Sequence, residues 1–154
     1  MELVVVVKSI VGHFSQRAAI RTTWGRCHNT NVKVVFALGY SKLYEEIVGD
    51  EYINCEDVIQ FSFLDTYKIL HISKIMSYNW VVSSCFCSTF VLFVDDDLYV
   101  NIPNILQFAH ERWNIQRTPY MEINSDSPSL TEMKVQNGIY QMRIIHTSYI
   151  QHIF

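Results

Sequence analysis

Four short and largely apolar segments constrain the fold of this chain most strongly. They occupy residues 3–10, 32–39, 57–63 and 89–94, and the first of them, LVVVVKSI, consists mainly of β-branched residues. Such near-continuous runs are typical of strands that are buried on both faces of a sheet. Stretches of helical length and spacing separate these segments, at residues 15–25, 41–55 and 64–85, and another follows at 102–113. This alternation predicts an α/β fold with a mostly parallel central sheet and flanking helices.

Local signals set the expected ends of these helices. Ser15 is placed to cap the first helix, and Gly25 to stop it. In the second helical stretch we expect a loop after Gly49, and Pro103 fits the first turn of the last helix. Residues 114–138 are polar and rich in turn formers, whereas residues 139–154 are apolar again and could form a strand or two.

Three adjacent aspartates, Asp95, Asp96 and Asp97, directly follow the fourth apolar segment in the stretch FVLFVDDDLYVN. Like charges repel, so carboxylates this close together need a compensating positive charge. Hard divalent ions such as Mn²⁺ and Mg²⁺ prefer oxygen ligands and often share them with a substrate phosphate. The position, at the carboxyl end of a predicted strand, is where open α/β sheets bind ligands. The sequence therefore predicts a site for a metal and a nucleotide, and the alternative is a solvated acidic turn.

Composition limits the other possibilities. The chain has 154 residues, 49% hydrophobic and 18% charged, which suits one globular domain. Its formal net charge of −3 implies no general affinity for nucleic acid or anionic membranes. Residues 75–94 carry no charged side chain and are numerous enough to span a membrane. However, six Ser, Thr and Asn residues in this stretch favour a buried helix followed by a buried strand. The apolar run Leu3–Val7 is too short for a signal peptide.

Four blocks, in order, resemble the β-1,3-glycosyltransferases of glycosyltransferase family 31, which include β-1,3-galactosyltransferases and β-1,3-N-acetylglucosaminyltransferases. The first is VVVVKSIVGHFSQRAAIRTTWG, which contains the pattern R-x-A-I-R-x-T-W-G, and the second is VVFALG. The third is EDVIQFSFLDTYKIL, and the fourth is FVLFVDDDLYVN with its aspartate motif. The resemblance covers roughly residues 3–110, and its strength lies in the order and spacing of the blocks.

This resemblance implies a GT-A-like fold in which residues 1–113 form the nucleotide-sugar-binding region. Residues 114–154 would be a divergent or incomplete start of the acceptor-binding half. Family members are type II membrane proteins of the Golgi that use Mn²⁺ to move a sugar from a UDP-sugar to a glycan hydroxyl, with inversion. From the sequence alone we expect no such anchor within these 154 residues. By the same resemblance Asp97 would coordinate Mn²⁺, Asp95 would lie towards the ribose and share in the metal site, and Asp96 would assist the metal or support it from behind.

Five further residues are candidates for binding the UDP-sugar. Arg17 and Arg21 are four apart and share one helix face, where they could lie near the nucleotide or form structural salt bridges. Asp65 and Tyr67 follow a predicted strand and could line the donor pocket, although Asp65 could equally cap a helix. Lys74 could meet a phosphate or simply be solvated.

The chain also departs from the family pattern. Where members usually show N-L-T-x-K-T this sequence has ILHISK, Ser62 stands at a usual Asp, and Phe93 at a frequent Lys. Transfer to a hydroxyl needs a general base, and no acidic residue after Asp97 sits in a block that matches the family's later Glu-Asp pair. An alternative is therefore a truncated, catalytically inactive relative that binds UDP and metal.

Overall fold

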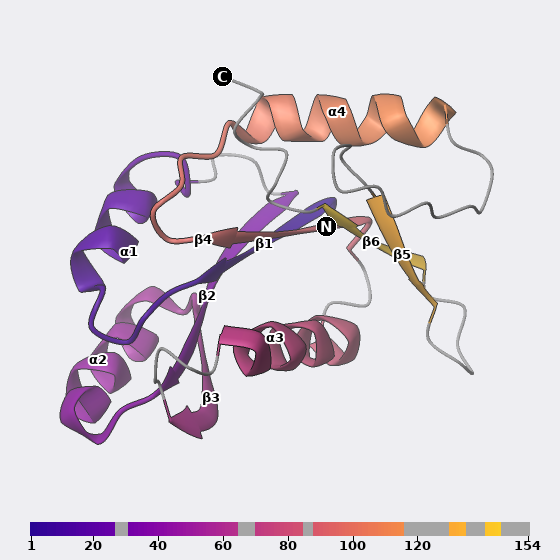
Figure 1. The fold of residues 1–154 in the computed structure, drawn as a ribbon. Helices are drawn as coiled ribbons and strands as arrows, with labels where there is room; N and C mark the ends of the chain where they lie inside the picture. The colour runs from indigo at the N-terminus through magenta and orange to yellow at the C-terminus, as the bar shows by residue number, and fades with distance from the viewer. Residues whose placement is uncertain (27–30, 65–69, 85–87, 116–129, 135–140, 146–154) are drawn as a thin grey trace.

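The computed structural model describes residues 1–26, 31–64, 70–84, 88–115, 130–134 and 141–145. Their helices and strands alternate along the chain, as the sequence predicts (Figure 1). In order the elements are β1 (Leu3–Lys8), α1 (Phe14–Thr22), β2 (Val32–Tyr40), the 3₁₀ helix η1 (Lys42–Tyr44), α2 (Glu45–Cys55), β3 (Val58–Leu64), α3 (Leu70–Ser84), β4 (Phe90–Asp95), α4 (Ile102–Ile115), β5 (Leu130–Lys134) and β6 (Gln141–Ile145).

The strands form one six-stranded sheet with the order β3-β2-β1-β4-β6-β5. β2 and β4 flank β1, and both pair with it in parallel; β3 pairs in parallel with β2, and β6 with β4. Only β5 runs antiparallel, beside β6 at the sheet edge. The predicted α/β fold with a mostly parallel sheet is therefore confirmed.

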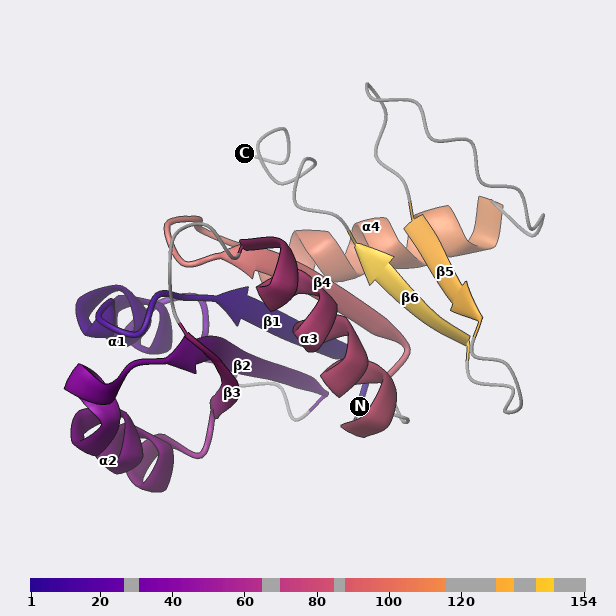
Figure 2. The same cartoon turned by 60° about the horizontal axis from the view of Figure 1, so that its bottom comes forward.

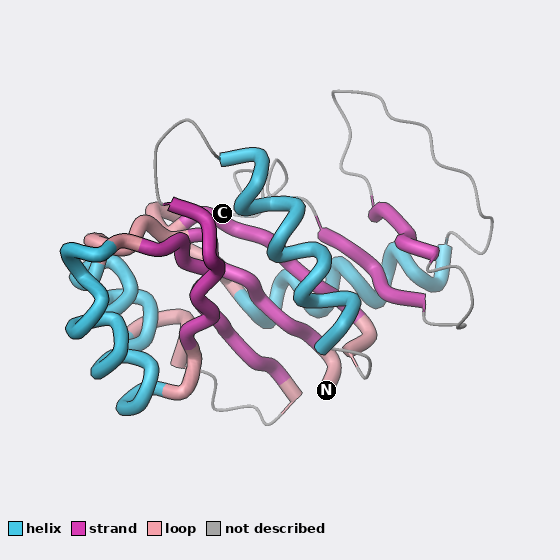
Figure 3. Tube along the Cα trace, turned by 90° about the horizontal axis from the view of Figure 1, so that it is seen from below, coloured by secondary structure: helices cyan, strands magenta, loops and turns pink. Residues whose placement is uncertain are grey.

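Each face of the sheet carries its own core, and β1 contributes to both because its side chains alternate between the faces. Leu3, Val5 and Val7 belong to a cluster that also takes in residues of α1, α2 and α4. Val4 and Val6 point into a second cluster, which includes Val81 and other residues of α3. Accordingly, α3 and α4 lie on opposite sides of the sheet, and α3 runs across its own face (Figures 1, 2 and 3). All five apolar residues of β1 are fully buried, as the uninterrupted run predicted.

Three local predictions are wrong. The first helix begins at Phe14 with His13 at its N-cap, so Ser15 lies inside the helix. The Ser15 hydroxyl donates a hydrogen bond to Oε1 of Gln16 and does not cap the helix. The expected loop after Gly49 does not form, because α2 continues to Cys55. Strand β5 lies in the segment that we expected to be polar and rich in turns. Pairing with the neighbouring strand β6 here outweighs the weak strand preference of the segment itself.

Gly25 follows α1 for a steric reason. A Cβ atom at this position would lie 2.7 Å from Cγ2 of Ile20 and 2.8 Å from the Ile20 carbonyl oxygen. The same carbonyl accepts a 2.8 Å hydrogen bond from the Gly25 N–H. The glycine of the sequence motif thus lets the chain turn back closely onto the last turn of the helix.

The uncharged stretch 75–94 is divided between the end of α3 and the central strand β4. Among the residues that the structure describes, no helix is both long enough and apolar enough to cross a membrane.

Candidate functional site

The predicted site lies where the sheet order reverses. From β1 the chain moves outward to β2 and β3, then returns to place β4 on the other side of β1. Lys8, the last residue of β1, stands opposite Asp95, the last residue of β4, in the parallel register. The carboxyl ends of two such strands diverge into separate loops and leave a crevice at this switch point. The aspartates therefore occupy the position at which ligands bind in open α/β sheets.

Asp95 is held by an ion pair with Lys8. The side chain of Lys8 is 14% exposed, whereas that of Asp95 is 50% exposed. Part of the compensating charge that three adjacent carboxylates require is thus supplied by the protein itself, from the neighbouring strand. The exposed half of Asp95 remains open to a ligand.

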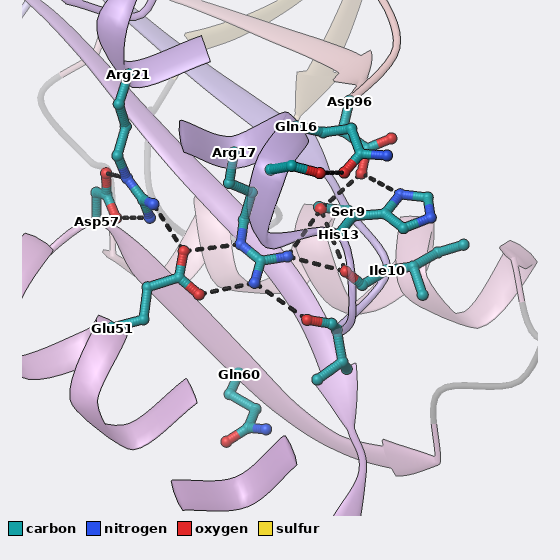
Figure 4. A network of polar contacts seen from close by, with 12 residues as sticks. Ser9, Ile10, His13, Gln16, Arg17, Arg21, Glu51, Asp57, Gln60 and Asp96 are labelled. Atoms are coloured by element: carbon teal, nitrogen blue, oxygen red, sulfur yellow. Dashed lines mark hydrogen bonds and ion pairs between the residues drawn. The ribbon is translucent and has the colours of Figure 1, made fainter. Parts of the chain in front are cut away.

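Asp96 turns back towards the loop between β1 and α1. Its Oδ2 atom accepts a hydrogen bond of 2.6 Å from the Ser9 hydroxyl and lies 2.8 Å from Nδ1 of His13 (Figure 4). An ionised carboxylate only accepts hydrogen bonds, so we assign the shared proton to Nδ1 of His13. The Asp96 side chain is only 11% exposed. Of the two roles that the family resemblance implies for Asp96, this placement suits support of a metal from behind.

Asp97 is the exposed member of the three. Within the described part of the chain, no three His, Cys, Asp or Glu side chains gather closely enough to hold a metal ion by themselves. An exposed carboxylate beside a half-exposed one suits a hard divalent ion that completes its shell with water and substrate phosphates. The donor set therefore fits a metal shared with a bound diphosphate and does not form a closed protein cage.

Arg17 anchors the loop that carries Ser9 and His13. Its side chain is fully buried and binds both oxygens of Glu51 on α2, at 2.8 Å and 2.7 Å. The same guanidinium donates to the Ser9 hydroxyl and to the carbonyl oxygens of Ile10 and Val11, at 2.9–3.1 Å. All three guanidinium nitrogens are thus engaged by this loop and by α2. The salt-bridge interpretation of Arg17 is the one that this geometry favours.

Arg21 extends the same network away from the aspartates. It forms a bidentate pair with Asp57, at 2.8 Å and 2.7 Å, and a second ion pair with Glu51 at 2.7 Å (Figure 4). Burial alone would lower the pKa of Arg21, but hydrogen bonds and charge from Asp57 and Glu51 raise it above its ordinary value. The two motif arginines therefore join α1 to α2 and to the start of β3.

The side chains of the remaining sequence candidates are not described by the structure. Asp65 and Tyr67 belong to residues 65–69, and Lys74 lies in α3 at a position whose side chain is not described. Their roles stay predictions, as does any contact of Arg17 or Arg21 with substrate. Lys8, Ser9 and His13 were missed, because they approach the aspartates only through the pairing of β1 with β4, which no local pattern in the sequence marks.

Acid should destabilise this protein through Glu51. Burial by itself would raise the pKa of its carboxyl group, but hydrogen bonds and charge from Arg17 and Arg21 hold it below the ordinary value of 4.5. A depressed folded-state pKa gives stabilisation that is complete above about pH 4.5 and is lost as the pH falls through the folded value. Urea unfolding of the wild type and of Glu51→Gln, from pH 7 to pH 3, should show a stability gap that narrows as the pH falls below about 4.5. A gap that stays constant over this range would contradict the assignment.

Comparisons with known proteins give the family. The fold and the site define an α/β protein with an acidic site at the switch point of its sheet. The family model described as Galactosyltransferase matches residues 15–154 of this chain. N-acetyllactosaminide beta-1,3-N-acetylglucosaminyltransferase 4 of Homo sapiens is 35% identical over 112 residues, which is 69% of this chain and 30% of that protein. Beta-1,3-galactosyltransferase brn of Drosophila melanogaster is 36% identical over 109 residues, 69% of this chain and 34% of that protein.

A third relative, lactosylceramide 1,3-N-acetyl-beta-D-glucosaminyltransferase A of Danio rerio, is 32% identical over 121 residues, 71% of this chain and 32% of that protein. This chain belongs to the galactosyltransferase family. The matched segments span about a third of the length of these relatives. The family predicted from the four sequence blocks is thereby confirmed.

Proposed function

We propose that this chain provides the donor-binding region of a β-1,3-hexosyltransferase, which moves galactose or N-acetylglucosamine from a UDP-sugar to a glycan hydroxyl with inversion. The observation that carries the proposal is the placement of Asp95–Asp97 at the switch point of a galactosyltransferase-family sheet. The names of the relatives support the β-1,3 linkage and the two donor sugars, since they include both N-acetylglucosaminyltransferases and a galactosyltransferase.

The residues of the chain divide the work of donor binding. Asp97, exposed, and Asp95, half exposed, would hold Mn²⁺, and Asp96 supports their turn from within. When bound, the ion would offset the negative charge that a UDP leaving group develops. Lys8 keeps the Asp95 carboxylate in place and reduces the repulsion among the three aspartates before a ligand arrives.

The acceptor and the cellular setting are part of the same proposal. The acceptor would be a hydroxyl on the glycan of a glycoprotein or glycolipid, and the reaction would take place on the lumenal side of the Golgi membrane, as the family resemblance implies. The described residues assign no general base, so donor binding and transfer are separate questions for experiment.

The test is a calorimetric titration of UDP into the purified chain, once with Mn²⁺ and once with EDTA. We expect binding with Mn²⁺ that weakens at least about tenfold in EDTA, and weaker binding of UMP, because the ion is shared with the diphosphate. Absence of UDP binding by a folded protein would overturn the proposal. A parallel assay with UDP-galactose, UDP-N-acetylglucosamine and a glycan acceptor separates a transferase from a relative that binds the donor without transferring it.

A further inference from the structure

We propose that Ser9 and His13 are positioning residues, which clamp the middle carboxylate of the aspartate turn and thereby present Asp97 to the metal and the diphosphate. This inference rests on the proposed function. It extends that function to two residues, both on the loop between β1 and α1, that contact neither the sugar nor the ion in the arrangement described above.

The clamp converges on a single oxygen atom. Ser9 and His13 lie 87 and 83 residues from Asp96 in sequence, yet both bind its Oδ2, at 2.6 Å and 2.8 Å. Hydrogen bonds of this length to an ionised carboxylate are among the strong ones. Because the Asp96 carboxylate is largely buried, water weakens these two hydrogen bonds little. The Asp96 carboxylate is less exposed than those of Asp95 and Asp97. The Asp96 side chain is therefore fixed by the loop that follows the neighbouring strand β1, while the side chain of Asp97 stays accessible.

The loop that carries the clamp is itself held rigidly. The Ser9 hydroxyl accepts a 3.1 Å hydrogen bond from the buried Arg17, so it donates to Asp96 and accepts from Arg17 at the same time. Arg17 also binds two carbonyl groups of this loop, and Glu51 fixes Arg17 in turn. Figure 4 shows the resulting chain of contacts from Glu51 through Arg17 and Ser9 to Asp96.

This arrangement has a consequence for ligand binding. The backbone of the turn closes with a hydrogen bond of 3.4 Å from the Leu98 N–H to the Asp95 carbonyl, which is long and weak on its own. An anchored Asp96 side chain supplies the order that this backbone bond does not. Groups that orient metal ligands from behind typically contribute about 10–100-fold in metal affinity, and the clamp belongs to this kind.

Three variants test the clamp. His13→Ala removes the donor to Asp96, whereas His13→Asn offers an amide N–H close to the place of Nδ1 and should restore part of the effect. Ser9→Ala removes the second donor to Asp96, but it also removes the hydrogen bond between Ser9 and Arg17. The two His13 variants are therefore the decisive ones. Ser15→Ala is the control: Ser15 lies in the first turn of α1, two residues after His13, is exposed, and in the part of the chain that the structure describes its side chain hydrogen-bonds to Gln16.

The first readout needs no ligand. Hydrogen–deuterium exchange of metal-free protein should speed up in the peptide around residues 94–99 in His13→Ala, stay near the wild-type rate in Ser15→Ala, and slow again in His13→Asn. The second readout is the Mn²⁺-dependent affinity for UDP, which should fall by about 10–100-fold in His13→Ala and recover in part in His13→Asn.

The outcomes are distinct. Unchanged exchange in His13→Ala would overturn the clamp, and faster exchange with unchanged affinity would overturn its positioning role. If the wild type binds no UDP, the proposed function fails and takes the positioning role with it, while the exchange experiment still decides whether the clamp orders the turn.

Discussion

Replacing Arg17 with methionine should cost this protein about 3–5 kcal/mol of stability, because removing one partner of a buried ion pair leaves uncompensated groups behind. The Arg17 side chain is fully buried and binds both Glu51 oxygens as well as the loop after β1. Methionine would fill much of the space but donate no hydrogen bond. Since domains are stable by only about 5–15 kcal/mol, we expect a large shift of the urea unfolding midpoint to lower denaturant.

Arg21→Met is the matched control for this prediction. Arg21 shares Glu51 with Arg17 and has its own pair with Asp57, but its side chain is 23% exposed. Water can therefore solvate the groups that its removal leaves. We expect a smaller loss, roughly 1.5–3 kcal/mol, which is typical of hydrogen bonds to charged groups. Equal losses in the two variants would show that burial does not set the strength of this network.

The sequence was sufficient for the fold because its strongest signals are local. The run LVVVVKSI became β1, with all five apolar residues buried, because β-branched residues favour a strand and both faces of this strand are covered. The helix boundaries were less accurate, as at Ser15, because a hydroxyl can hydrogen-bond to a neighbouring side chain as readily as cap a helix. Strand β5 was missed because its place depends on β6 and not on its own composition.

The site was predictable only in part. The aspartates follow a strand, and this was enough to place them at the carboxyl edge of the sheet, beside the end of β1. That a ligand binds there stays a prediction. The partner of Asp96 could not be deduced, since its contact with Ser9 joins residues that are far apart in sequence. The same holds for the contact of Arg17 with Glu51. No spacing rule marked His13, because its relation to Asp96 arises from the register of two parallel strands.

Asp97→Ala should abolish most of the Mn²⁺-dependent binding of UDP without harming the fold. Asp97 is exposed, and substitutions at exposed positions usually change stability by less than about 0.5 kcal/mol. Removing one of three adjacent carboxylates also relieves repulsion, so the unfolding midpoint should stay or rise. Loss of a direct metal ligand should exceed the effect of a supporting group. We therefore expect an affinity loss on the order of 100-fold or more, about 2.8 kcal/mol.

Asp50→Ala separates this effect from a simple change in net charge. Asp50 is an exposed carboxylate on α2, and its replacement changes the formal charge of the protein by the same amount. It should leave UDP affinity unchanged. If Asp97→Ala weakens binding no more than Asp50→Ala does, Asp97 holds no ion. If Asp97→Ala instead lowers the unfolding midpoint strongly, its carboxylate supports the turn and not a ligand. A stable protein that has lost only its metal-dependent binding is the result that assigns Asp97 to function, since a bound cation offsets the repulsion among the three carboxylates that Lys8 leaves uncompensated.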